Sequence, residues 1–188
     1  AMVESPEELT RFYRRIAEWN KRYIDNALEI GVDVIHVSDD WGMNGRLLFP
    51  PGLWWALVYP TEKITTDHAK ARGALLSLHC DGDFTSVLDG VVQLGFNVVH
   101  PVQVSAGMDQ LAFKKDYGDR LTLYGGLDVR ETLGRNRPEV VEREVRWLMD
   151  NLKPGGGFIF CTSHMVQPGT PLAEVEAAFQ LALELSWY

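Results

Sequence analysis

A histidine, a thiol and two carboxylates lie within the six residues 78–83, which have the sequence LHCDGD. Histidine, thiolate and carboxylate groups are ligands for transition metals, and a cysteine beside a histidine base can act as a nucleophile. A strand that merely ends in polar residues would have the same composition without a catalytic or metal-binding role. The choice among these three interpretations depends on which of the side chains point in the same direction.

Helical and strand-like segments alternate around this cluster. Amphipathic stretches, such as residues 14–31 and 138–157, each lead through glycine into a short apolar run that ends in polar residues. This alternation is typical of βα units that form a parallel sheet. We predict about five strands, and they lie within residues 32–40, 74–82, 96–103, 121–128 and 158–164.

The βα units predict an α/β fold, for which two architectures remain open. Five strands could form a doubly wound open sheet or part of a (β/α)8 barrel, which needs eight strands and about 250 residues. The glycines of residues 153–158 precede a strand rather than a helix, and this disfavours a phosphate-binding loop. Residues 46–60, rich in tryptophan and proline, are expected to form an irregular insertion over one end of the sheet.

Side chains alternate between the two faces of a strand, and this alternation divides the cluster. His79 and Asp81 share the face that looks into a barrel or cleft, whereas Cys80 faces the helices. The same counting in the last strand puts His164 on the inner face and Cys161 on the helix side. Both thiols are therefore expected to be small buried hydrophobes rather than nucleophiles.

His79, Asp81 and His164 together make a set of two histidines and one carboxylate, which is a common ligand set for a metal ion. The same three groups could instead bind polar atoms of a substrate, and both interpretations remain open. Asp40 follows the first strand and is predicted to be a catalytic group in the same cleft. Its alternative role is to cap the turn that comes next.

Asp128 is a further candidate catalytic residue, because it follows Gly125 and Gly126 at a strand end. Two glycines let the backbone approach a ligand closely, so both are predicted to contact a cofactor or substrate. A tight bend at the rim of a barrel would need the same residues. His36 and His100 fit a core position and a site position equally well.

Composition excludes several classes of partner. The net charge is −8 and the sequence has no basic run, so a nucleic-acid partner is not expected. The chain also has no apolar run of membrane-spanning length. Its two cysteines do not make a disulfide framework, and we expect a cytoplasmic protein with reduced thiols.

Four motifs, taken together, resemble the C-terminal part of the uroporphyrinogen decarboxylase superfamily. They are HVSDDWGMNGRLLFPPGLW, SLHCDGDF, YGGLD and CTSHMVQPGTPLAEVEAAF, at residues 36–54, 77–84, 124–128 and 161–179. The resemblance implies a single domain over residues 1–188, which is part of a (β/α)8 barrel without the family's N-terminal part. Two open sheet edges would then remain, so we expect a homodimer or a separate N-terminal half.

The resemblance implies an enzyme of one of two kinds. The methyltransferases of the superfamily move a methyl group between a corrinoid protein and a small thiol or a pterin, and the quoted motifs favour this branch. The alternative is decarboxylation of an acidic tetrapyrrole in porphyrin biosynthesis, which uses no metal. A third possibility is a barrel fragment without catalytic activity that serves in assembly.

The superfamily's zinc-dependent methyltransferases carry a His-x-Cys motif and a later cysteine as ligands. By this resemblance His79 matches the first ligand, whereas Asp81 and His164 stand at the two cysteine positions. The resemblance thus implies a divalent metal, with zinc as the first candidate. The exchange of thiolates for harder donors favours a metal that polarises an oxygen or activates water.

Overall fold

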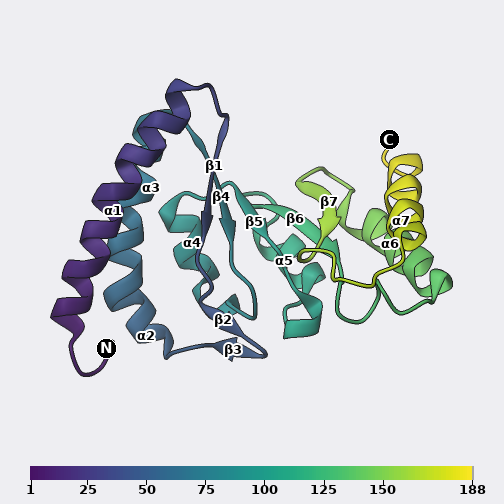
Figure 1. The fold of residues 1–188 in the computed structure, drawn as a ribbon, viewed down its shortest axis with the longest axis horizontal. Coiled ribbons are helices and arrows are strands. Elements are labelled where there is room, and N and C mark those ends of the chain that lie inside the picture. Colours follow the sequence, from purple (N-terminus) through teal and green to yellow (C-terminus); the bar gives the residue numbers. More distant parts are fainter. Residues whose placement is uncertain (188) are drawn as a thin grey trace.

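The computed structural model describes residues 1–187, so Tyr188 of the predicted domain lies outside the described residues. Its centre is one sheet of five parallel strands in the order β1-β4-β5-β6-β7. The strands are β1 (Val34–Ser38), β4 (Leu75–His79), β5 (Val98–His100), β6 (Thr122–Leu127) and β7 (Phe158–Thr162). The predicted α/β fold and its five parallel strands are confirmed (Figure 1).

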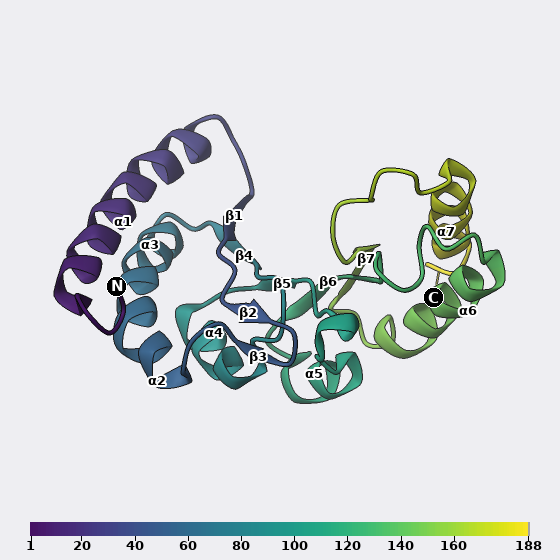
Figure 2. The same cartoon turned by 60° about the horizontal axis from the view of Figure 1, so that its bottom comes forward.

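The helices follow the predicted alternation with the strands. They are α1 (Pro6–Glu29), α3 (Tyr59–Ala71), α4 (Leu88–Leu94), α5 (Gln110–Tyr117), α6 (Pro138–Leu152) and α7 (Leu172–Glu184). Figure 2 shows them in an arc along one side of the sheet, while the other side is open. Within residues 1–187, each helix is too short or too polar to cross a membrane.

The helix-facing side of the sheet forms the hydrophobic core, to which Leu76, Val99 and Leu123 contribute side chains without solvent exposure. On the opposite side, Leu75 and Ile159 are 51% and 47% exposed. An exposed apolar sheet face of this kind is typical of a surface that another element covers. Five strands therefore form an open half-barrel, because closure of this type of barrel takes eight strands.

The segment of residues 46–60 is more regular than we predicted. A short antiparallel hairpin, β2 (Gly42–Met43) with β3 (Arg46–Leu47), comes first, followed by α2 (Pro51–Leu53) and the π-helical turn η1 (Trp54–Val58). The helix can start because Pro51 occupies its first turn, where the backbone needs no N–H donor. The fully buried Trp54 then packs edge-on against Trp41 and ties the segment to the core.

Candidate functional site

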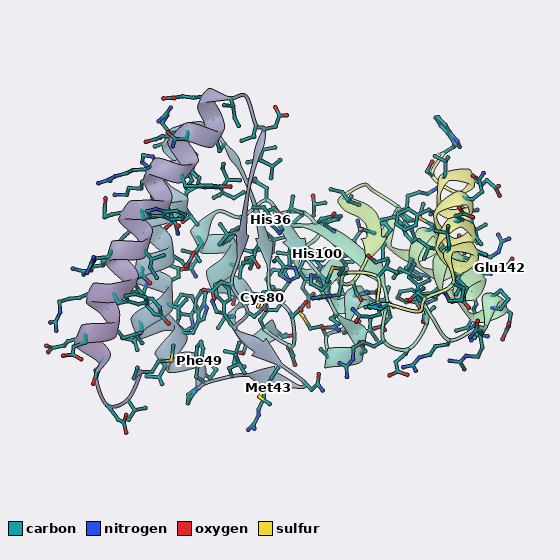
Figure 3. All side chains as sticks on the ribbon, in the orientation of Figure 1. His36, Met43, Phe49, Cys80, His100 and Glu142 are labelled. Atoms are coloured by element: carbon teal, nitrogen blue, oxygen red, sulfur yellow. The ribbon has the colours of Figure 1, made fainter. Side chains whose placement is uncertain are left out.

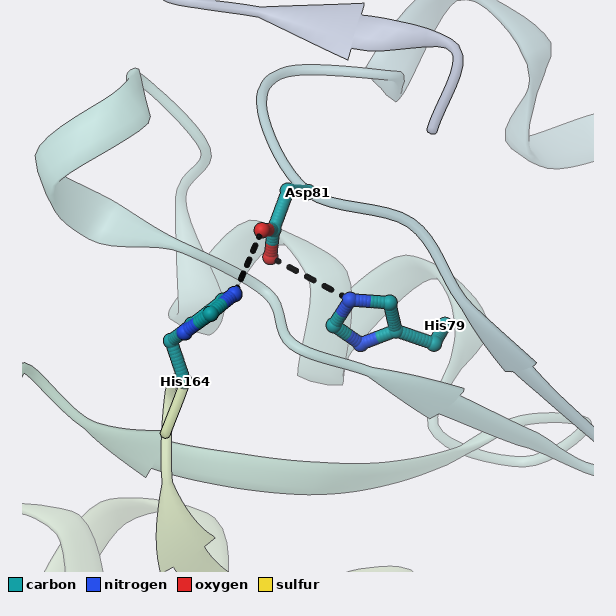
Figure 4. Close-up of side chains that lie close together, drawn as sticks. All are labelled: His79, Asp81 and His164. Carbon is teal, nitrogen blue, oxygen red and sulfur yellow. Dashed lines mark ion pairs between the residues drawn. The ribbon is translucent and has the colours of Figure 1, made fainter. Parts of the chain in front are cut away.

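Three of the predicted site residues meet at the C-terminal ends of β4 and β7. His79 is the last residue of β4, Asp81 follows in the next loop, and His164 lies two residues beyond the end of β7. Asp81 lies between the two histidines: its Oδ1 is 3.6 Å from His79 Nε2 and its Oδ2 is 3.2 Å from His164 Nε2 (Figure 4). One ligand atom from each residue lies within 4.8 Å of the others. We refer to these residues as the triad.

Hydrogen bonds hold the Asp81 loop against the β2–β3 hairpin and the residues beside it. The Asp83 amide donates to the Met43 carbonyl of β2 at 2.9 Å. The Asp81 amide donates to Asp40 Oδ1 at 2.9 Å, and the Gly82 amide donates to Gln103 Oε1 at 3.4 Å. Gly82 has φ +81, and a Cβ added to it would lie 2.3 Å from the carbonyl carbon of Gly42. The two glycines let the loop and the hairpin touch backbone to backbone, and this contact positions the Asp81 carboxylate.

We predict that Gly82→Ala destabilises the protein and displaces Asp81. The left-handed backbone costs alanine about 1–2 kcal/mol, and the contact with Gly42 requires a further shift of backbone. Gly31→Ala is the matched control, since Gly31 has φ +90 but nothing within 4 Å of an added Cβ. Urea unfolding should therefore show a larger loss for Gly82→Ala. Equal losses in the two variants would contradict the close-packing argument.

The charges of the triad favour a cation. Asp81 Oδ1 is buried and has no hydrogen-bond partner among residues 1–187, and an unsatisfied buried acceptor costs about 1–3 kcal/mol or more when it is charged. Asp40 adds a second carboxylate, with its Oδ1 3.8 Å from His79 Nε2. A bound divalent ion would neutralise both carboxylates and supply the partner that Asp81 Oδ1 lacks.

The donor atoms of the triad also fit a catalytic metal. Two imidazole nitrogens and one carboxylate form the protein ligand set of several catalytic zinc sites, in which a fourth position stays open for water or substrate. A pocket of about 420 Å³ adjoins the triad, which leaves room at such a position. Its lining includes Asp81, Gly82, Gln103, Arg130, His164 and Gln167.

Two further histidines, His36 and His100, lie on the inner face beside the triad, and both are labelled in Figure 3. His100 Nδ1 is 2.8 Å from His79 Nδ1, and His36 Nδ1 is 3.0 Å from Ser77 Oγ. Burial lowers the pKa of the His36 imidazole and lowers that of His100 to about 4. The sequence left both histidines open, but their register beside Ser77 and His79 places them on the same inner face.

The two cysteines differ from each other. Cys80 is fully buried, accepts a hydrogen bond from the Trp41 amide at 3.3 Å, and burial raises the pKa of its thiol to about 12, so its predicted packing role is confirmed. The prediction for Cys161 is wrong. Phe160 is the residue that packs on α7, through Phe179. Cys161 pairs with Gly126 of β6 and points to the opposite, inner face.

Asp128 lies apart from the triad. Its Oδ1 accepts hydrogen bonds from the amides of Arg130 at 2.6 Å and Glu131 at 2.8 Å, which is the geometry of a turn cap. An added Cβ on Gly125 would lie 3.3 Å from the His100 ring, and one on Gly126 would lie 3.1 Å from Leu148. In this structure these three residues therefore shape the strand end, and their predicted ligand contacts stay predictions.

Sequence reasoning missed a second group of carboxylates, behind β1. Glu62 and Asp39 line a cavity of about 310 Å³ together with Tyr13. Burial, with a smaller contribution from Asp39, raises the pKa of Glu62 to about 7. The three residues come from separate elements, α3, the end of β1 and α1, so no local motif could have indicated the group.

We predict that Glu62→Gln stabilises the protein more at pH 8 than at pH 5. The folded-state pKa of Glu62 lies above its ordinary value of 4.5. Its stabilising contribution is therefore complete below about pH 4.5 and is lost as the pH rises through 7. Urea unfolding of the variant and of an exposed control, Glu176→Gln, should be compared at both values. A constant difference between Glu62→Gln and the wild type would contradict the prediction.

With the geometry established, comparison with known proteins decides the family. The family model described as uroporphyrinogen decarboxylase (URO-D) matches residues 1–185. The chain belongs to the URO-D family. This URO-D chain is similar to two curated proteins named uroporphyrinogen decarboxylase. It is 24% identical over 189 residues to that of Methylococcus capsulatus and 26% identical over 174 residues to that of Syntrophotalea carbinolica.

The matches cover nearly all of this URO-D chain but only part of its relatives. They take in 98% and 90% of the chain, against 51% and 47% of the two relatives, so the chain spans about half of their length. A methyltransferase from Methanosarcina mazei has a similar fold, with a TM-score of 0.72 and 20% identity, over 91% of this chain and 48% of that one. The likeness shows that this chain and part of that methyltransferase share a fold.

Proposed function

We propose that this chain supplies the metal-binding part of the active site of a methyltransferase in the URO-D superfamily. The observation that carries the proposal is the convergence of His79, Asp81 and His164, with an unpaired buried carboxylate oxygen, at one mouth of the half-barrel. Such a metal supplies Lewis acidity, which lowers the pKa of a bound thiol or polarises a bound oxygen. The methyl acceptor is a small thiol or a pterin, and the donor is a methylated corrinoid carried by a partner protein.

The chain's own residues have distinct tasks in this proposal. The triad holds the metal, while the adjoining pocket receives the reacting end of the acceptor. Asp40 lies 3.8 Å from His79 and adds negative charge beside the metal without belonging to the triad. The backbone contact between Gly82 and Gly42 keeps the Asp81 carboxylate between the two histidines.

Decarboxylation of an acidic tetrapyrrole is the second candidate, and the printed names of the two curated relatives favour it. The charges at the mouth disfavour it. Three carboxylates lie near the mouth: Asp81 and Asp83 in the loop after β4, and Asp40 just before the β2–β3 hairpin. Among the described residues, Arg130 is the arginine or lysine that lines the pocket. A substrate with several carboxylates would meet like charges there, which weakens binding.

The molecules that the purified protein binds distinguish methyl transfer from decarboxylation. We expect the purified chain to bind zinc, measured by competition with a chromogenic chelator, and to bind uroporphyrin weakly or not at all. With zinc bound, it should speed methyl transfer from free methylcobalamin to a small thiol, followed by the absorbance of the corrinoid. Tight uroporphyrin binding without zinc binding would reverse the assignment. Zinc binding without transfer would favour a fragment that acts only within an assembly.

The missing part of the barrel belongs to the same proposal. Both edge strands, β1 and β7, have a neighbour on one side in the described sheet, and the inner face carries exposed apolar side chains. The complement that fits is a polypeptide with three further βα units, since eight strands close a barrel and five are present. It would also cover the pocket and exclude water from the triad.

A further inference from the structure

A chain of hydrogen bonds leads from His79 away from the proposed metal and into the sheet. His79 Nδ1 lies 2.8 Å from His100 Nδ1, and His100 Nε2 lies 3.1 Å from the carbonyl oxygen of Thr162. The contacts connect β4, β5 and β7, so they cross three strands of the half-barrel. Among the groups that these hydrogen bonds connect, His79 alone belongs to the triad.

The hydrogen-bond partners determine which imidazole nitrogens of His79 and His100 carry protons. The carbonyl oxygen of Thr162 can only accept a hydrogen bond, so His100 Nε2 must carry a proton. A neutral imidazole has one N–H, and therefore His100 Nδ1 presents a lone pair. The contact of 2.8 Å between the two Nδ1 atoms then requires that His79 Nδ1 carries the proton and donates it.

The opposite nitrogen of His79 is thereby defined. In the neutral Nδ1–H form, Nε2 carries a lone pair, and it faces Asp81 Oδ1 at 3.6 Å and Asp40 Oδ1 at 3.8 Å. A lone pair beside two carboxylate oxygens is repelled unless a cation or a second proton lies between them. The hydrogen-bond chain thus presents Nε2 to the position that a metal would occupy.

We propose that His100 is a positioning residue that fixes His79 in the Nδ1–H tautomer, so that Nε2 is the metal-facing atom. The proposal rests on the proposed metal-binding role of His79, which it deepens. Histidine ligands commonly donate their second N–H to an outer acceptor, and that acceptor is usually a carboxylate or a carbonyl. Here a second histidine takes this place and passes the hydrogen bond on to the backbone of β7.

Packing keeps the His100 ring in the orientation that its hydrogen bonds to His79 and Thr162 require. The His100 ring stacks on that of His79, with centroids 5.0 Å apart. The Tyr124 ring also contacts His100, with a centroid distance of 4.7 Å. A Cβ on Gly125 would lie 3.3 Å from His100 Cδ2 and would crowd the ring.

Nitrogen-15 NMR of the metal-free chain tests the proposal directly, because protonated and unprotonated imidazole nitrogens differ strongly in chemical shift. We expect Nδ1 of His79 in the wild type at pH 7.5 to carry a proton. His100→Phe keeps an aromatic ring in the stack but removes the acceptor, and His79 should then populate the Nε2–H form. A wild-type His79 in the Nε2–H form would overturn the proposal, even if the variant did not fold.

Zinc affinity gives a second readout with a matched control. His100→Phe should weaken zinc binding about 10–100-fold, the usual effect of losing an outer hydrogen-bond partner. His36→Phe is the control, since the His36 ring lies 6.1 Å from that of His79 but is hydrogen-bonded to Ser77 instead. Equal affinities in wild type and His100→Phe, or equal losses in both variants, would argue against positioning. If no variant binds zinc, the metal site fails, while the tautomer result still decides the role of His100.

Discussion

Asp81→Asn is expected to weaken zinc binding by more than about 100-fold, which is the upper end of the effect of an outer-partner mutation. The substitution keeps the size of the side chain but removes the negative charge that lies between His79 and His164. It also replaces a carboxylate, one oxygen of which is buried, by a neutral amide, which binds a cation much more weakly. Competition with a chelator of known affinity measures the change, and methyl transfer to a thiol should fall with it.

Neighbouring carboxylates provide the controls for this result. Asp83→Asn changes a residue of the same loop whose Oδ1 accepts from the Thr85 amide at 2.9 Å and which lies outside the triad. Asp40→Asn should give an intermediate loss, because Asp40 contributes charge near His79 at 3.8 Å. Zinc affinities that are the same in Asp81→Asn and Asp83→Asn would mean that Asp81 is not a ligand.

The strand pattern could be predicted because parallel strands and their helices leave periodic signals. The alternation of side chains inside β4 correctly separated His79 from Cys80, since both residues belong to or adjoin a regular strand. The same rule failed for Cys161 because the count began at His164. β7 ends at Thr162, and alternation does not continue through the irregular residues that follow.

Long-range contacts explain what the sequence could not predict. The hydrogen bond between His79 and His100 depends on the register of two strands that are 21 residues apart in the chain. The carboxylates Glu62 and Asp39 meet only because α3 and the residue after β1 line the same cavity. The order of segments predicts which elements are neighbours, but their exact register and rotation come from side-chain packing, which the periodicity does not contain.

The second large expected effect concerns the open half-barrel, which should associate in solution. The long helix α1 exposes an apolar row of Phe12, Ile16, Trp19 and Tyr23, with exposed fractions of 57%, 40%, 63% and 61%. Their spacing of four, three and four residues is that of a helix seam that packs on another helix. Sedimentation velocity should therefore show dimers or larger species when the chain is alone.

Trp19→Ser should weaken this association by roughly 30-fold, since a buried interface tryptophan typically contributes about 2 kcal/mol or more. Trp147→Ser, on the outer side of α6 with 39% exposure, is the matched control and should leave the association unchanged. A monodisperse, folded wild-type monomer would contradict the expectation. An equal loss in both tryptophan variants would show that the α1 row is not the contact.

A three-βα complement should replace this self-association with a single closed barrel. The match covers 51% of the Methylococcus capsulatus relative, and the part of that relative that the match does not cover is a concrete probe when it is fused upstream. Each large apolar side chain that becomes buried adds about 1.5–3 kcal/mol, so the fusion should unfold at a higher urea concentration and sediment as a monomer. If the fusion still self-associates while the chain alone forms a stable dimer, the second copy is the true occupant of the open face. The triad would then function at a dimer interface rather than inside a completed barrel.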